Sequence, residues 1–157
     1  MITLLYVFDL DGTLADITHR LHFIQCDKPD YDAFYDACDK DVPVAWTINL
    51  LNILALHGHV LVLSGRRESV REKTLDWLQE NHIRFAHLRM RPQKNHEKDV
   101  VIKKKMLMDF LQDYPQYKTE FIIDDRQVVV NMWRQEGFAV LQCNSWKEYD
   151  RNTTRPT

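Results

Sequence analysis

The sequence predicts an α/β fold in which a parallel sheet lies between two layers of helices. Short apolar runs alternate along the chain with longer stretches of helical spacing, as in strands joined by right-handed helical crossovers. The apolar runs are also continuous, which is typical of strands that are covered on both faces. The five expected strands are residues 6–9, 60–64, 84–89, 120–124 and 138–143.

The first expected strand lies in the apolar run at residues 1–8. This run is short, has no basic segment before it and leads directly into Asp9. A membrane-spanning helix needs about 20 apolar residues, and a secretory signal begins with basic residues. We therefore interpret the run as a buried strand, and we expect no membrane partner and a cytoplasmic location.

The segment that follows, residues 16–43, does not fit the alternation of strands and helices. It is rich in Asp, His and aromatic residues and contains Pro29 and Pro43. We interpret it as a small helical, cap-like insertion after the first strand, within a single domain of residues 1–157. A chain of this length can bury one core without disulfides.

Four helices are expected from the spacing of apolar residues, at 44–56, 68–81, 100–111 and 126–136. Gly58 and Gly137 precede expected strands, where a helix ends in a left-handed cap. Gly12 and Gly65 instead follow strands. Ligands of open α/β sheets bind at the carboxyl ends of the strands, so these two glycines indicate backbone that passes close to a substrate.

The charge balance excludes a protein that coats nucleic acid or anionic membrane. Lys and Arg number 21 against 23 Asp and Glu, a net charge of −2, so a polyanion must be held locally. A local basic rim is available from Arg66, Arg67, Arg84, Arg89, Arg91, Lys94 and Lys98. The three cysteines have no C-x-x-C spacing, which indicates reduced thiols.

Two acidic strand ends predict phosphoryl chemistry. Asp9 and Asp11 end the first strand, where Asp9 can face a metal and a phosphorus atom while Asp11 reaches the leaving-group oxygen. The alternative is an exposed turn with Gly12 as the turn residue. Asp124 and Asp125 end another strand, and burying two neighbouring carboxylates is costly unless a cation such as Mg²⁺ compensates.

Two further segments supply groups that bind phosphate. Ser64, Gly65 and Arg66 offer a hydroxyl, backbone N–H groups and a guanidinium, although such a segment is also common as a simple turn. Asp99 and Lys103 lie four positions apart on one helix face, so the carboxylate can hold the ammonium. The alternative is a solvated pair within a lysine-rich run.

Taken in this order, the segments resemble the haloacid dehalogenase (HAD) superfamily of aspartate-nucleophile phosphatases. The chain is most similar to the 3′-phosphatase domain of bacteriophage-type polynucleotide kinase/phosphatase, over residues 6–137. The resemblance rests on residues 8–15 (FDLDGTLA), 62–66 (VLSGR), 99–103 (DVVIK), 123–126 (IDDR) and 131–134 (NMWR). It implies a Rossmann-like, three-layer parallel sheet. No P-loop string G-x-x-x-x-G-K-[ST] occurs, so only the phosphatase half is implied.

The resemblance also implies a role for each site residue. Asp9 would attack phosphorus, and Asp11 would protonate the leaving hydroxyl and then activate water. Mg²⁺ would lie between Asp9, the main-chain carbonyl of Asp11 and Asp125, with Asp124 close by or reaching it through water. Ser64 and Lys103 would hold the phosphoryl oxygens, and Asp99 would orient Lys103. The implied substrate-binding residues are Thr13, Arg20, Gly65, Arg66 and Asp99.

Several other residues have alternative interpretations. His19, His22 and Cys26 are spaced like metal ligands, but a fourth ligand is not evident. The tryptophans of the helical segments, Trp46, Trp77 and Trp133, are expected in the core. Tyr31, Phe34 and Tyr35 could either stack on a base or pack the insertion, and packing is favoured.

We therefore expect a Mg²⁺-dependent phosphomonoesterase that removes 3′-phosphate from nucleic-acid ends. The insertion is too short to enclose a small metabolite. The alternative is a 5′(3′)-nucleotidase acting on free nucleoside monophosphates. A receiver-type switch domain also groups acids, a hydroxyl and a lysine, but its acid pair and phospho-acceptor come from different strands, whereas Asp9 and Asp11 share one.

Overall fold

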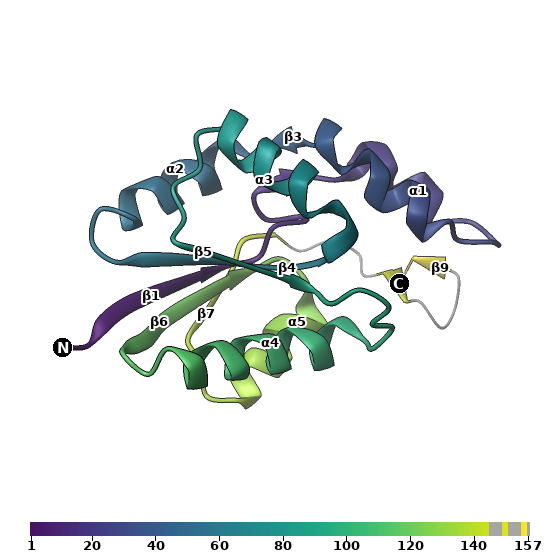
Figure 1. Cartoon of the computed structure of the whole chain (residues 1–157). Coiled ribbons are helices and arrows are strands. Elements are labelled where there is room, and N and C mark those ends of the chain that lie inside the picture. The colour runs from purple at the N-terminus through teal and green to yellow at the C-terminus, as the bar shows by residue number, and fades with distance from the viewer. Residues whose placement is uncertain (145–148, 151–154, 157) are drawn as a thin grey trace.

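A five-stranded parallel sheet forms the centre of the computed structural model, which describes residues 1–144, 149–150 and 155–156. The strand order is β5-β4-β1-β6-β7, and every neighbouring pair is parallel. The strands are β1 (Thr3–Phe8), β4 (His59–Arg67), β5 (His87–Arg91), β6 (Tyr117–Asp124) and β7 (Val140–Gln142). The prediction of an α/β parallel sheet is confirmed (Figure 1).

Helices cover both faces of this sheet. Figure 1 shows α2 (Ala45–Leu54) and α3 (Arg71–Glu80) on one face, and α4 (Asp99–Asp113) and α5 (Gln127–Gln135) on the other. A short helical turn, η3 (Glu68–Val70), leads into α3. Outside the three layers lies a two-stranded antiparallel pair, β8 (Tyr149–Asp150) with β9 (Arg155–Pro156). No described helix has both the length and the apolar character needed to cross a membrane.

Strand β1 divides the core into two halves, because alternate side chains of a strand point to opposite faces. Tyr6 and Phe8 pack with Trp77 under α2 and α3, whereas Leu5 and Val7 pack with other residues under α4 and α5. Both faces of β1 are therefore shielded from water. This explains why polar residues do not alternate with apolar ones in its sequence.

The register of the central strands brings their carboxyl ends to one edge. Phe8 pairs with Val62 of β4 and with Ile123 of β6. Asp9, Ser64 and Asp124 follow these paired positions by one or two residues, so they emerge together. The strand pairing thus assembles the site before any side-chain contact is considered.

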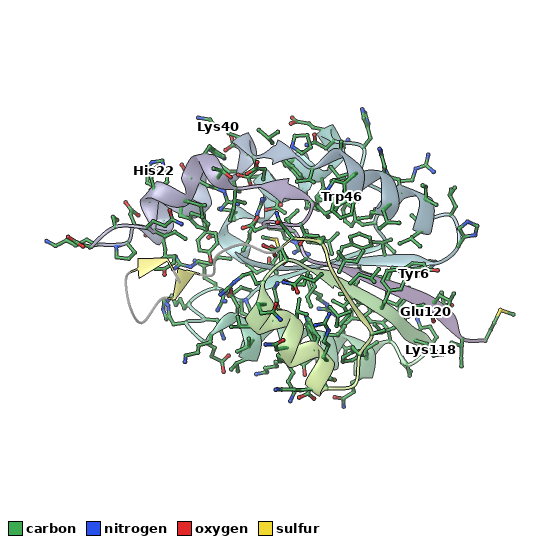
Figure 2. The ribbon with its side chains drawn as sticks, turned by 180° about the vertical axis from the view of Figure 1, so that it is seen from behind. Tyr6, His22, Lys40, Trp46, Lys118 and Glu120 are labelled. Carbon is green, nitrogen blue, oxygen red and sulfur yellow. The ribbon has the colours of Figure 1, made fainter. Side chains whose placement is uncertain are left out.

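The segment expected as a helical insertion folds as three short helices between two short strands. They are η1 (Thr18–Phe23), α1 (Tyr31–Asp36) and η2 (Ala37–Lys40), and the antiparallel pair of β2 (Ala15–Asp16) and β3 (Val42–Pro43) closes the segment. In Figure 2, His22 and Lys40 of this segment lie at the opposite end of the molecule from Lys118 and Glu120 of β6. The insertion therefore lies beside the carboxyl ends of the strands.

All five strands have boundaries that differ from those predicted, and the differences at β5 and β4 bear on the site. The strand expected at 84–89 is β5, which begins later because His82 takes a left-handed conformation (φ 54°) and the backbone N–H of Arg84 donates to Asn52 Oδ1. Strand β4 continues to Arg67, so Gly65 lies within it rather than after it. The apolar pattern marks the buried middle of a strand and not where its ladder stops.

The tryptophan prediction holds for two of the three residues. Trp77 and Trp133 are buried, with exposed fractions of 2% and 0%. Trp46 is 55% exposed, so its core placement is wrong. It lies in the first turn of α2, where the neighbouring Thr47 is the buried residue and donates its hydroxyl to the carbonyl oxygen of Thr13.

Candidate active site

Three buried carboxylates meet at the carboxyl ends of β1 and β6. Asp9 follows β1, Asp124 ends β6 and Asp125 comes next, with exposed fractions of 4%, 1% and 4%. One oxygen of each lies within 4.8 Å of the others. Among the described residues, this is the group of acidic, histidine or cysteine side chains close enough to share a metal ion.

Lys103 enters this cluster from α4. Its Nζ donates to Asp9 Oδ1 at 2.6 Å and to Asp124 Oδ2 at 2.8 Å. Burial of the ammonium opposes its charge, but Asp124 and Asp9 outweigh this effect and raise the pKa of Lys103 above its usual value. Lys103 is therefore a fixed cation that orients Asp9.

One ammonium cannot balance three carboxylates, and the pKa values reflect this deficit. Burial, together with the charge of Asp124, raises the pKa of Asp9 to about 6 even though Lys103 opposes the shift. Burial, followed by the charges of Asp9 and Asp124, raises the pKa of Asp125 to about 9. A dry cluster of oxygen ligands with excess negative charge fits a hard divalent cation such as Mg²⁺.

The turn after β1 fits closely around Asp125. Gly12 has φ +85°, and a Cβ atom there would lie 2.1 Å from Asp125 Oδ2. The hydroxyl of Thr13 donates to Asp9 Oδ2 at 3.1 Å, and Thr13 is fully buried. Glycine is thus required at position 12 by both its conformation and its surroundings. Thr13, predicted to bind substrate, binds the carboxylate of Asp9 in this structure.

Asp11 lies on the other side of the turn, between two guanidinium groups. Its Oδ1 lies 2.7 Å from Arg66 Nε and 2.9 Å from an Arg20 nitrogen, and its side chain is 20% exposed. Burial alone would raise the pKa of Asp11, but Arg66 and Arg20 together lower it below its usual value. Both arginines, predicted to contact substrate phosphate, are fully buried against this carboxylate.

Asp41 completes this arrangement and is not predicted from the sequence. Its carboxylate accepts hydrogen bonds from Arg20 Nε and an Arg20 amino nitrogen, both at 2.7 Å, and from Arg66 at 2.6 Å. His19 Nε2 lies 2.8 Å away, and the Asp41 carbonyl accepts from Trp77 Nε1. Asp41 is fully buried and lies between η2 and β3, in no recognisable motif. A further acid could be expected only indirectly, because two buried arginines need more than one carboxylate partner.

The second strand end contributes Ser64 and Gly65. Ser64 is fully buried, and its Oγ accepts from the backbone N–H of Arg66 at 3.1 Å. The carbonyl oxygen of Gly65 accepts from the Tyr35 hydroxyl and from Arg91 Nε. A Cβ at Gly65 would lie 3.3 Å from Asp99 Oδ1. These contacts bring the insertion and the first residue of α4 to the end of β4.

Asp99 has different hydrogen-bond partners from the one expected. It accepts from Arg91 and Arg126, whereas the ammonium of Lys103 donates to Asp9 and Asp124. The predicted direct pairing of Asp99 with Lys103 is therefore wrong. Arg91 lies at the end of β5 and Arg126 lies just before α5. Both guanidinium groups reach Asp99, which is the first residue of α4. Asp99 still acts on Lys103 through its charge, which raises the pKa of the ammonium.

The predicted basic rim is smaller than expected. Arg66 and Arg91 are buried in ion pairs, and Arg84 precedes β5, at the opposite edge of the sheet. Arg67, Lys94 and Lys98 remain at least partly exposed near the carboxyl ends of β4 and β5. The sequence could not separate these groups because a run of basic residues does not show which of them pair inward.

The chain is similar to known proteins in sequence and in fold. A family model described as the polynucleotide kinase PNKP phosphatase domain matches residues 4–147. A chain of the Pnkp1/Rnl/Hen1 complex aligns at 32% identity and a TM-score of 0.74, over 91% of this chain and 46% of that one. The present chain therefore spans about half the length of that relative.

Two more distant structures share the fold. A haloacid dehalogenase-like hydrolase from Streptococcus pneumoniae aligns at 19% identity and a TM-score of 0.65, over 90% of this chain and 84% of that one. The HAD domain of the effector protein Lem4 from Legionella pneumophila aligns at 16% identity and a TM-score of 0.51, over 96% and 91%. At these identities the likeness concerns the fold alone.

Proposed function

Because the chain belongs to the family of the polynucleotide kinase PNKP phosphatase domain, a HAD phosphatase family, we propose that it removes 3′-phosphate from polynucleotide ends. The resemblance predicted from the sequence motifs is confirmed, and the protein is a phosphoric monoester hydrolase. The observation that most supports the proposed chemistry is the position of Asp9, which contacts Lys103 within the acidic cluster while Asp11 lies two residues away on the open side.

In the first step, a carboxylate oxygen of Asp9 attacks phosphorus. The bond between phosphorus and the 3′-oxygen breaks, and Asp11 gives a proton to the departing oxygen. Because Arg20 and Arg66 hold the pKa of Asp11 below its usual value, Asp11 carries this proton when the bound phosphate takes over part of these guanidinium contacts. In the second step, Asp11 takes a proton from water, and the water oxygen attacks the aspartyl-phosphate. The bond to Asp9 then breaks and inorganic phosphate leaves.

Asp9, Asp124 and Asp125 would hold Mg²⁺, together with the main-chain carbonyl of Asp11. When bound, the ion would neutralise negative charge on the phosphoryl oxygens and on the attacking carboxylate. Lys103 and the hydroxyl of Ser64 would bind two phosphoryl oxygens. An incoming phosphate dianion would also contact the guanidinium groups of Arg20 and Arg66, which pair with Asp11 and Asp41.

The similarity to a chain of a complex described as an RNA repair complex supports RNA ends among the substrates. That complex joins its chain to Rnl and Hen1, so protein partners in end repair are part of the proposal. The cysteines Cys26, Cys38 and Cys143 are unpaired, which supports a reducing compartment such as the cytoplasm.

Phosphate release tests the proposal. Matched 3′-phosphate and 5′-phosphate oligonucleotides of RNA and DNA, and 3′- and 5′-mononucleotides, are incubated with Mg²⁺ or with EDTA. The proposal predicts preference for the 3′-phosphate oligonucleotide, dependence on Mg²⁺ and no turnover by Asp9→Asn protein. Preference for mononucleotides would instead identify a nucleotidase, and turnover by Asp9→Asn protein would exclude the aspartyl-phosphate mechanism.

A further inference from the structure

A cleft opens between the insertion and the end of β4. Its volume is about 530 Å³, and the side chains that define it are Asp32, Tyr35, Arg67, Ser69 and Gln93. They come from α1, from the end of β4 with the η3 turn, and from the loop after β5. This volume lies within the range of small-molecule sites, and no step of the proposed mechanism uses the cleft.

Tyr35 joins this cleft to the active site. Its hydroxyl donates to the carbonyl oxygen of Gly65 at 3.3 Å, next to Ser64. The preceding residue, Phe34, is buried and lies under the guanidinium of Arg20, 4.3 Å from ring centre to Cζ. Helix α1 thus directs the ring of Phe34 into the core and the ring of Tyr35 toward the cleft. Of the two interpretations of these aromatic residues, packing applies to Phe34 and in part to Tyr35, which is half-buried against the core.

Arg67 lies over the ring of Tyr35. Its guanidinium carbon lies 5.1 Å from the centre of the Tyr35 ring, and its side chain is 22% exposed. Its ion-pair partner Asp32 is 92% exposed, so the pair is weak and easily exchanged. A planar guanidinium held against an aromatic ring is suited to stacking on a nucleobase.

The charges around the cleft favour a base over a second phosphate. Arg67 is three residues beyond Ser64, on the part of β4 where the register with β5 shifts. The rim also carries Asp32 and Asp36, each paired with one cation, Arg67 and Lys73, so it offers no excess positive charge to a phosphodiester. The cleft therefore combines a stacking surface with a rim whose charges are balanced.

We propose that the Tyr35–Arg67 cleft binds the nucleobase of the terminal nucleotide while its 3′-phosphate lies at Asp9. This inference rests on the proposed function and extends it, because it makes the base of the last nucleotide part of what the enzyme recognises. A polymer end and a free nucleotide both present a nucleobase. The base that the cleft binds belongs to a polymer end.

The test compares two 3′-phosphorylated oligonucleotides that differ in one group. One carries a normal terminal nucleotide and the other an abasic one at the same position. Stacking on a protein surface supplies about a 5- to 150-fold effect, so the wild-type kcat/KM should favour the normal end by that factor. Arg67→Ala should abolish this ratio by slowing the normal substrate and leaving the abasic one unchanged.

Matched variants separate stacking from general damage. Arg84→Ala removes an arginine at the opposite edge of the sheet and should keep the wild-type ratio. Tyr35→Leu should lower the ratio, whereas Tyr35→Phe, which keeps the ring, should retain it. Equal hydrolysis of both oligonucleotides by wild-type protein, or an equal loss on both in Arg67→Ala, would overturn the inference. So would an effect of Arg67→Ala confined to 3′-mononucleotides.

Failure of the proposed function gives a different result, namely no hydrolysis of any 3′-phosphate. In that event, binding of the same fluorescent oligonucleotides is measured by anisotropy. Tighter binding of the normal end, lost in Arg67→Ala, supports the cleft independently of catalysis. Equal binding of the two ends overturns it.

Discussion

The carboxylates of Asp11 and Asp41 are bound by the same two guanidinium groups, those of Arg20 and Arg66. Asp41 is fully buried, whereas the side chain of Asp11 is 20% exposed. The insertion thus supplies Asp41, on the buried side of the arginines, and the turn after β1 supplies Asp11, on their more exposed side. The orientation of the proposed proton donor depends on a residue that never reaches the substrate.

Asp41→Asn should therefore damage both stability and activity. The substitution leaves two buried guanidinium groups with one carboxylate between them, and removing one partner of a buried pair costs about 3–5 kcal/mol. Urea unfolding gives the free energy, and phosphate release gives kcat. Asp39→Asn, an exposed acid in the same turn, is the control and should change neither quantity appreciably. A wild-type unfolding curve for Asp41→Asn would contradict this account of the network.

Gly12→Ala and Gly137→Ala should differ sharply although both glycines have positive φ, +85° and +87°. At Gly137 an added Cβ meets nothing within 4 Å, so the cost is the left-handed conformation alone, about 1–2 kcal/mol, with full activity. At Gly12 the same atom would lie 2.1 Å from Asp125 Oδ2 and displace that carboxylate. Thermal melting with and without Mg²⁺ should show that only Gly12→Ala loses stabilisation by the ion. Equal behaviour of the two variants would contradict this.

Metal-free protein should lose stability as pH rises. The folded-state pKa values of Asp9 and Asp125, about 6 and about 9, lie above the ordinary value of 3.8. Protonation of these groups therefore favours folding at low pH, and that contribution is lost as pH rises through their folded pKa values. In EDTA the melting temperature should fall between pH 5 and pH 9.

Mg²⁺ should offset this loss, so the rise in melting temperature that it causes should grow with pH. Asp125→Asn removes the group with the higher pKa and serves as the control, with a flatter pH profile in EDTA. A stabilisation by Mg²⁺ of the same size at every pH would contradict the assignment of these acids to the metal.

Native thiols should react very unequally with iodoacetamide. Cys26 is exposed and should be alkylated at pH 8. Burial raises the pKa of Cys143 to about 12, and it raises the pKa of the fully buried Cys38 as well, so both remain protonated and unreactive. Peptide mass spectrometry measures each rate, and urea-unfolded protein is the control in which all three react. Alkylation of Cys143 as fast as Cys26 in folded protein would contradict this.

The sequence predicted those parts of the site that local pattern determines. Asp9 and Asp124 end apolar runs, and a parallel sheet necessarily brings such strand ends to one edge. Asp41 was missed because its role depends on how the insertion packs over β4, and nothing in its neighbouring residues shows this. The partner of Asp99 was misassigned for a similar reason, since helical spacing favours Lys103 whereas tertiary packing supplies Arg91 and Arg126.

The strand order also determines when, during translation, the active site can form. Strand β1 has β4 and β6 as its neighbours, so the first strand made during synthesis must wait for both. Asp125 leaves the ribosome on the order of 10 s after Asp9 at ordinary rates of translation. Until then the apolar residues of β1 have no native partner on the β6 side. The nascent chain should therefore depend on chaperones or on the ribosome surface more than a protein built from local contacts would.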